Sequence, residues 1–560
     1  MSDRRFHAVR FLRGAFRNSP WLVIALGFHV IVITLMSVLY LQRERAGRNE
    51  TPTTIAVSAS RDEAPVALVP PQRIEPHRIP ENSAAELVSF DELAFVPTQE
   101  AVEQDLHLDI GNPTGTDDAS DGERGGTSIG VGKGGHRGTG TSPFSSRNPG
   151  SGKGGKHGRS PQGQLVGTEK AVLEGLCWLV RHQGEDGSWS PLTCRERCNP
   201  RSPCIPAEAQ LQPFYDEGLT GLALLAFLGS GFTSDSRNLL TDRAMGKQYV
   251  LGDVLKKGLK WLVERQKEDG SFSATRPFLY NEAIATMALS EAYGLSRNRY
   301  FKKPAQQGVD FLVAAQKVDS LNGLSGWRYG SRAELETRRA AGEIDDETYF
   351  AELWDADASV TGWVIMALKS AQISGLAVPA GVMEGGLGFV RSVSRDDGLV
   401  GYLDLAGAGA AVGGAGHEYT YHPGTMSALG MLVRTFVAHD LTDPFLEAAA
   451  RQIIQDPPTI SRDELSIDYY YWYYATLALN QFDGPDSPRQ SGEYWNRWNK
   501  AMQEAVLELQ DKSDERDTCS RGGWLRNDRW SRQGSVVYGT AINTLTLEVY
   551  YRYENAFGVR

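Results

Sequence analysis

The sequence has no long run of basic residues in the part that looks folded, and its net charge is −11 over 560 residues. Nucleic acid is therefore excluded as the main partner, because phosphate backbones are bound through clustered Lys and Arg. Cysteine is scarce, with five residues, three of which lie within residues 194–204. Glycine is abundant, with 60 residues, which is well above ordinary usage.

Only one segment is hydrophobic for long enough to cross a membrane. Residues 21–41 carry no formal charge, and no small-x-small cleavage site follows them. A helix of this length spans a bilayer core of about 30 Å. Five arginines precede it and three follow it, which places residues 1–20 in the cytoplasm as a basic segment. The sequence thus predicts a single-pass inner membrane protein whose folded part is extracytoplasmic, in a periplasm-like space.

Residues 42–165 have the composition of a linker. The first half is rich in Pro, and the second half is a Gly/Ser/Lys tract that contains Gly132-Lys133-Gly134-Gly135. Such segments bury too little apolar surface to offset their ordering entropy. We therefore expect a disordered tether between the membrane helix and a domain over residues 166–560.

A pattern recurs through this domain. Gly175-Leu176-Cys177-Trp178-Leu179-Val180 is followed by Gln183 and then by Asp186-Gly187-Ser188-Trp189. Further copies begin at Gly258 and Gly308, and weaker ones lie near Gly386 and Gln510. Repeats at such spacing indicate an array of similar units. Each unit reads as a helix that ends in a glycine turn.

A second set of segments lies between these helices and is more apolar, as expected for helices covered on most sides. The predicted inner helices span residues 215–229, 280–294, 357–374, 422–439, 469–482 and 538–551. Alternating inner and outer helices in six pairs are typical of a closed double ring. The predicted fold is therefore all-α.

The Gly-Leu-x-Trp-Leu-Val-x-x-Gln-x-x-Asp-Gly-Ser-Trp pattern closely resembles the QW repeat of squalene and oxidosqualene cyclases. The same (α/α)6 toroid is used by protein prenyltransferase β subunits and complement thioester domains. The resemblance covers residues 166–560 and implies this toroid as the fold. One toroid hosts unrelated functions, so each activity has to be tested on its residues.

Cyclases of the squalene–hopene type protonate a double bond with an Asp-x-Asp-Asp cluster, in which crowded carboxylates keep one proton. The matching residues here are Asp355-Ala356-Asp357-Ala358. The resemblance implies Asp357 as the proton donor, with Asp355 in support and the last acid replaced by Ala358. The chain also has no room for the second helical barrel of those enzymes.

Prenyltransferase β subunits bind zinc through an Asp-x-Cys pair and a later His. The resemblance implies Asp357 and His422 as zinc ligands, with Ser359 in place of the cysteine, so the ligand set is incomplete. These enzymes also act with a helical partner subunit in the cytoplasm. The Cys-Gly-Glu-Gln sequence of thioester domains is absent.

Polar residues recur where inner helices begin, and in a toroid these starts converge on one mouth of the cavity. A polar rim is therefore predicted there as a binding site. The rim residues are Asp216, Glu217, Glu282, Asp357 and His422. Capping of exposed backbone N–H groups is the alternative role for each of them. Tyr470 and Trp472, in an aromatic run, either face the cavity or pack between helices.

The cysteines point to ring closure. Cys194, Cys198 and Cys204 follow the first outer helix, and Cys519 lies in the equivalent loop of the last unit. The first and last units of a closed ring are neighbours. We therefore expect a disulfide between Cys519 and one of the other three, with metal binding as the alternative.

Two functions follow from these patterns. The first is a membrane-anchored binding or scaffold module that holds a peptide, glycan or lipid on the rim. The alternative is a terpenoid cyclase or prenyl-transfer enzyme that uses Asp357 as an acid or metal ligand.

Overall fold

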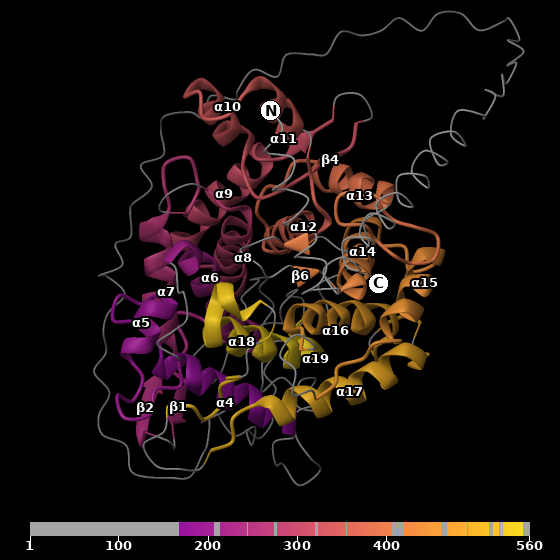
Figure 1. Ribbon diagram of the computed structural model, residues 1–560. Helices are drawn as coiled ribbons and strands as arrows, with labels where there is room; N and C mark the ends of the chain where they lie inside the picture. Colours follow the sequence, from indigo (N-terminus) through magenta and orange to yellow (C-terminus); the bar gives the residue numbers. More distant parts are fainter. Residues whose placement is uncertain are drawn as a thin grey trace, which may run out of the picture. The chain divides into compact units, whose positions relative to one another are not determined.

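The computed structural model (Figure 1) describes residues 167–552, except for 206–212, 243–244, 274–276, 320–322, 354, 406–410, 413–418, 421, 461–466, 486, 490, 514–518, 526–527 and 529. The predicted basic segment, the membrane helix over residues 21–41 and the linker over residues 42–165 all lie outside the described residues.

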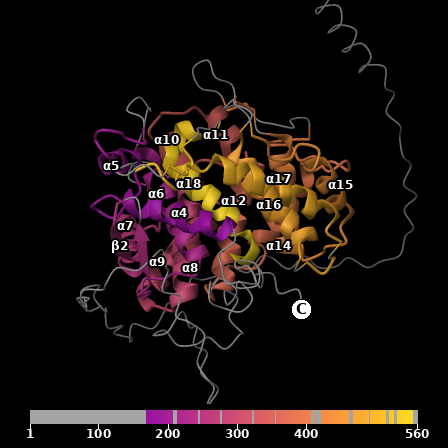
Figure 2. The ribbon, with the colours of Figure 1, turned by 90° about the horizontal axis from the view of Figure 1, so that it is seen from below.

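Six inner helices form a closed ring within the described part of the chain. They are α6 (Asp216–Gly229), α8 (Leu279–Ser296), α12 (Ala358–Ile373), α14 (Pro423–Ala438), α16 (Tyr469–Asp483) and α18 (Ser531–Leu547). Each packs against the next in this order, and α18 packs against α6. Figures 1 and 2 both place α18 beside α6, so the last inner helix meets the first. The helical α/α architecture predicted from the sequence is thus confirmed.

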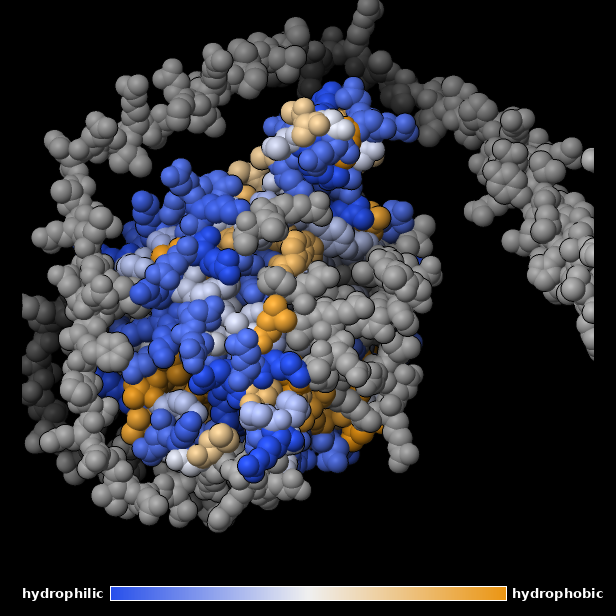
Figure 3. Space-filling model, turned by 60° about the vertical axis from the view of Figure 1, so that its left-hand side comes forward, coloured by the Kyte–Doolittle hydropathy of each residue, from blue (hydrophilic) through white to orange (hydrophobic). Residues whose placement is uncertain are grey.

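Six outer helices cover the ring. They are α4 (Gly167–Arg181), α7 (Leu251–Arg265), α9 (Arg299–Ala314), α13 (Val382–Ser392), α15 (Pro444–Ile453) and α17 (Glu493–Leu509). Their sequences explain their place: in α7, Leu255, Leu259 and Leu262 are fully buried, while Lys257 and Lys260 face solvent. This is the one-sided pattern of a helix with a single covered face. On the face shown in Figure 3, the coloured residues are mostly hydrophilic and the apolar ones form small separate patches.

Shorter helices lie in the connections between the ring helices. They are α5 (Pro191–Glu196), the 3-10 turn η3 (Pro213–Tyr215), α10 (Arg332–Ala340), α11 (Asp346–Leu353) and α19 (Val549–Arg552). Three antiparallel strand pairs are also present: β1 (Leu239–Asp242) with β2 (Lys247–Val250), β3 (Lys317–Val318) with β4 (Ser325–Gly326), and β5 (Ala411–Val412) with β6 (Tyr419–Thr420).

A glutamine after the outer helix links neighbouring repeats. In three repeats its amide donates both to a glycine carbonyl in the turn of its own repeat and to a backbone carbonyl of the next outer helix; these glutamines are Gln183, Gln266 and Gln510. In a fourth repeat, Gln316 donates to the Ser325 hydroxyl and to the Val382 carbonyl of α13. Gln510 donates to the carbonyl oxygen of Gly522 at 3.0 Å and to that of Ala171, in α4, at 2.8 Å. The last repeat is therefore tied to the first by the same bond that joins consecutive repeats.

The tryptophan after the turn links the outer helix to the inner one. The Trp327 backbone N–H donates to the Thr361 hydroxyl of α12 at 3.1 Å, and its indole N–H donates to the Leu312 carbonyl at 2.7 Å. Trp189 and Trp524 make the same pair of bonds in their repeats. These buried polar contacts fix the first turns of α6 and α12, and the middle of α18, against the turn that precedes each helix.

The other end of the inner ring is occupied by a buried ion cluster. Arg552, in α19, donates to both carboxylate oxygens of Glu291 at 3.0 and 3.1 Å and lies 3.5 Å from Glu548. Its guanidinium also donates to the Leu225 carbonyl at 2.8 Å. All three charged side chains are fully buried, so α19 is joined to α6 and α8 near their C-terminal ends and to Glu548, which directly follows α18.

The predicted localisation has to be corrected. None of the helices in the described part of the chain is long and apolar enough to cross a bilayer, so a single-pass inner membrane protein with an extracytoplasmic ring is not supported. Charge bias around one apolar run was the basis of that prediction, and that run is outside the described residues.

Replacement of Gln510 by Met should weaken ring closure. The side chain keeps its size, but the Ala171 and Gly522 carbonyls lose their donor, which should lower the free energy of unfolding by about 1–3 kcal/mol. Urea denaturation of the purified chain measures this change. Gln248→Met, at an exposed position of β2, is the matched control and should change it by less than about 0.5 kcal/mol. An equal effect of the two substitutions would contradict the closing role of Gln510.

Candidate functional site

The predicted rim residues divide into separate groups in the structure. Asp216 and Glu217 open α6, and Glu282 lies in the first turn of the neighbouring α8. Glu282 is fully buried and accepts hydrogen bonds from the Phe272 N–H at 2.7 Å and the Ser273 hydroxyl at 2.6 Å. These bonds hold the turn that follows α7, so the carboxylate has a structural role.

Burial perturbs the acids of this group. It raises the pKa of Glu282 to about 7, against the lowering effect of the hydrogen bonds from Ser273 and Phe272. Burial also raises the pKa of Asp216 to about 6. Both carboxyls can thus gain a proton closer to neutrality than free ones.

Asp357 caps the inner helix α12. Its Oδ1 accepts from the Val360 N–H at 2.7 Å, and its Oδ2 lies 3.9 Å from Nε of Arg328. The side chain is fully buried, and this burial raises the pKa of Asp357 to about 7. Asp355 forms ion pairs with Lys317, at 2.5 Å, and with Arg328. The two acids therefore share one guanidinium, which lies in the loop after β4.

A chain of hydrogen-bonded hydroxyl groups begins at Ser359, two residues after Asp357, and reaches the neighbouring inner helices. The Tyr280 hydroxyl donates to Ser359 Oγ at 2.7 Å, and Ser359 Oγ lies 2.6 Å from the Tyr470 hydroxyl. Trp363 Nε1 donates to the same Tyr470 oxygen at 3.1 Å. The chain of hydroxyls thereby connects α8, α12 and α16.

His422 is turned away from these acids. Its Nδ1 accepts from the Gly424 N–H at 3.0 Å, which caps α14, and its Nε2 lies 2.5 Å from Asp456 Oδ2. The ring stacks on Tyr471, with centroids 4.1 Å apart. Both ring nitrogens are thus engaged, and the residues present do not fit a zinc site built on Asp357, Ser359 and His422.

The aromatic run of α16 packs mainly inside the ring. Trp472 is buried and meets Tyr469 edge-on at 5.6 Å, so it serves packing between helices. Tyr470 is the member that joins the hydroxyl chain. A second buried acid pair lies beside this run, where Asp468 caps α16 and Asp528 accepts from the Tyr469 N–H at 3.0 Å.

Five half-buried aromatic side chains form a continuous cluster beside the starts of α6 and α8. We name this cluster the aromatic wall; its members are Phe214, Tyr215, Phe278, Tyr280 and Tyr329. Phe278 is its centre, with ring centroids 5.1 Å from Phe214, 5.4 Å from Tyr280 and 5.8 Å from Tyr329. Tyr280 links the wall to the hydroxyl chain, and the hydroxyl of Tyr329 lies 2.5 Å from that of Tyr402.

Neither the aromatic wall nor Arg328 was predicted from the sequence. Phe214 and Phe278 each stand two residues before an acid or aromatic that opens an inner helix, and this spacing was the available signal. Tyr329 and Arg328 carry no such signal, because they come from a loop whose path depends on the β3–β4 pair.

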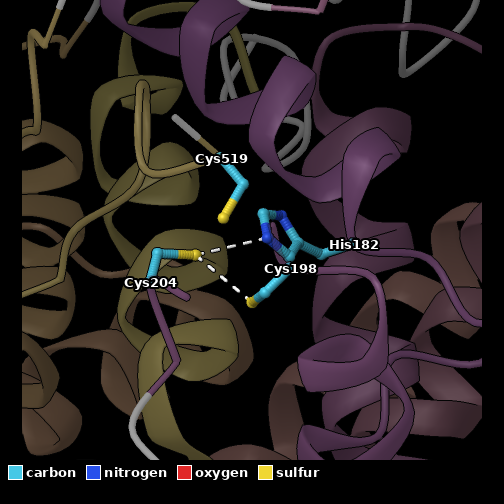
Figure 4. A group of neighbouring side chains, drawn as sticks. All are labelled: His182, Cys198, Cys204 and Cys519. Atoms are coloured by element: carbon cyan, nitrogen blue, oxygen red, sulfur yellow. Dashed lines mark hydrogen bonds between the residues drawn. The ribbon is translucent and has the colours of Figure 1, made fainter. Parts of the chain in front are cut away.

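The predicted disulfide also has to be corrected. All five cysteines are free thiols, and Cys194 is buried in α5. Cys198, Cys204 and Cys519 do come together as ring closure predicts, but the Cys198 and Cys204 sulfurs are 3.7 Å apart, far beyond the ~2.05 Å of a disulfide. His182, which the sequence analysis did not select, is the fourth member of their cluster (Figure 4).

Comparison with known proteins gives structural likenesses at low identity. No family model matches the chain, and no curated protein does either. A type II terpene cyclase from Scytonema, solved with merosterolic acid A, is 11% identical with a TM-score of 0.41 and covers 70% of this chain and 98% of its own. An α-1,6-mannanase from Salegentibacter is 10% identical with a TM-score of 0.42 and covers 68% and 98%. A protein from Actinoplanes is 14% identical with a TM-score of 0.39 and covers 69% and 99%.

The substitution Asp357→Asn should flatten the dependence of stability on pH. The pKa of Asp357 is higher in the folded state than in the unfolded state, so the folded state binds this proton more tightly. The contribution of Asp357 to the free energy of unfolding is therefore greatest below about pH 4 and falls as pH rises towards 7. Asn also caps helices and cannot ionise. We therefore expect the variant to gain more than about 1 kcal/mol relative to the wild type between pH 4.5 and pH 7.5. Urea denaturation at the two pH values tests this, and parallel profiles would contradict it.

Proposed function

We propose that the ring is a binding module in which the aromatic wall holds an oligosaccharide. The observation that carries the proposal is the wall itself: five linked aromatic rings, all half-buried, beside polar groups at the inner-helix starts. Clustered aromatic surface that remains partly exposed on a folded protein marks a binding surface.

The chemistry of the wall suits a sugar. A pyranose has an apolar C–H face and a rim of hydroxyls, so it needs flat aromatic surface next to hydrogen-bonding groups. Tyr supplies both properties in one side chain. Three of the five wall residues are tyrosines, and Arg328, half-buried beside Tyr329, adds donors at the edge.

Asp355 and Asp357, which the resemblance to cyclases implied as catalytic acids, are better explained as structural groups. The side chain of Asp357 is fully buried and caps α12, so a substrate cannot reach it in this conformation. Asp355 is neutralised by two cations, which disfavours the shared proton that an acid catalyst of this type needs. Ser359 is committed to Tyr280 and Tyr470.

Binding should be detectable on an array of neutral oligosaccharides probed with the full chain, and measured by calorimetry with the best ligand. Phe278→Ala and Tyr280→Ala should each weaken binding about tenfold or more, because each removes a stacking face. Phe350→Ala is the matched control, since this exposed aromatic lies on α11 outside the wall. A ligand that binds all three variants equally, or no oligosaccharide ligand at all, would refute the proposal.

One observation favours a second candidate, an isoprenoid cyclase. The pKa of Asp357, raised by burial to about 7, is suited to a general acid at neutral pH. Incubation with squalene and with geranylgeranyl diphosphate, followed by mass spectrometry of the extracted products, tests this candidate. Cyclised product that disappears in Asp357→Asn would support it, and unchanged substrate would exclude it for these two isoprenoids.

A further inference from the structure

Three segments that are far apart in the sequence converge where the ring closes. His182 follows the first outer helix α4, and Cys198 and Cys204 lie in the connection that leads from α5 towards α6. Cys519 comes from the loop between α17 and α18, in the last repeat. Figure 4 shows the four side chains pointing towards one another.

The ligand atoms of this cluster lie close enough together for a tetrahedral metal site. The Sγ atoms of the cysteines and one nitrogen of His182 all lie within 4.8 Å of one another. Cys198 Sγ is 3.7 Å from Cys204 Sγ, and Cys204 Sγ is 3.3 Å from His182 Nε2. Sulfur ligands about 2.3 Å from zinc at tetrahedral angles are about 3.8 Å apart, and a sulfur and an imidazole nitrogen are about 3.5 Å apart.

The surroundings orient the ligands as a metal requires. His182 Nδ1 lies 2.8 Å from the Trp178 carbonyl oxygen, so a proton on Nδ1 is donated there and the lone pair of Nε2 points to the sulfurs. The imidazole also stacks on the Trp178 ring, with centroids 4.0 Å apart. The Asn199 backbone N–H donates to Cys519 Sγ at 3.3 Å, which stabilises a thiolate.

We propose that His182, Cys198, Cys204 and Cys519 bind one zinc ion that closes the ring. Three cysteines and a histidine fill all four positions of a tetrahedral site, which is the ligand set of structural zinc rather than of a catalytic metal with an open position. Burial agrees with this role: His182 is fully buried, and Cys198 and Cys519 are 6% and 2% exposed. The site is independent of the aromatic wall and of the proposed sugar ligand.

The metal would add a direct cross-link to bonds that already join the first and last repeats. Arg521, two residues after Cys519, pairs with Glu174 of α4 at 3.0 Å, and the Arg181 guanidinium donates to the Arg521 carbonyl. These contacts hold the two loops at the spacing that the four ligands need. Loss of the ion should therefore leave the helices formed but loosen this junction first.

Metal content of the full chain, purified without chelator, tests the proposal. Inductively coupled plasma and native mass spectrometry should find one zinc ion per chain. Cys198→Ser, Cys204→Ser and Cys519→Ser should each abolish stoichiometric zinc. Cys177→Ser and Cys194→Ser are the matched controls, because these cysteines are buried as well but lie outside the cluster, and both variants should retain the ion.

A second measurement covers the case in which the cluster variants fail to fold. The wild-type chain, stripped with a chelator and reloaded with Co²⁺, should show the intense visible absorption of tetrahedral cobalt bound to thiolates. Its melting temperature should fall on stripping and return on reloading. Free thiols without stoichiometric metal, a disulfide among these cysteines in non-reducing peptide maps, or stoichiometric iron in place of zinc would each overturn the assignment.

Discussion

The side-chain amide that joins four of the six repeats to the next, at Gln183, Gln266, Gln316 and Gln510, is the contact on which the ring depends. It works only because the turn beneath it approaches the neighbouring outer helix closely. At Gly522 the backbone has φ of +86°, and an added Cβ would lie 2.1 Å from the Glu174 carbonyl oxygen. Gly187 and Gly270 occupy the same position in earlier repeats, against Lys257 and Gln307. A turn without a side chain and a forked amide donor together set the spacing between units, and Gln510 repeats this geometry at the junction.

This spacing also determines where the chemistry of the ring can lie. Each glycine turn is followed by an inner helix. Hydrogen bonds such as that from the Trp327 N–H to the Thr361 hydroxyl fix where this helix starts. Capping groups and aromatic side chains at those starts are thereby brought to one end of the ring. The opposite end is occupied by Arg552 and its two buried glutamates.

Periodicity in the sequence was sufficient to predict the helices and their alternation, because burial on one face or on all faces leaves a direct trace in composition. The sequence also predicted that Cys519 lies beside the first repeat, because the first and last units of a closed ring are neighbours. The chemistry of the cysteines at that junction could not be predicted from the sequence. Whether sulfurs 3.7 Å apart bond to one another or to a metal depends on His182, which in the sequence looks like an ordinary neighbour of Gln183. The environment of Asp357 was equally hidden, because Arg328 reaches it from a loop.

The closing cluster and the aromatic wall belong to the same connection. Cys204 belongs to the cluster, and Phe214 and Tyr215 of the wall follow it ten and eleven residues later in the same α4–α6 connection. Phe214 contacts Phe278, the centre of the wall, and its carbonyl accepts from Asn281 of α8 at 2.7 Å. One end of this connection is thus held by the ring junction and the other by the next inner helix.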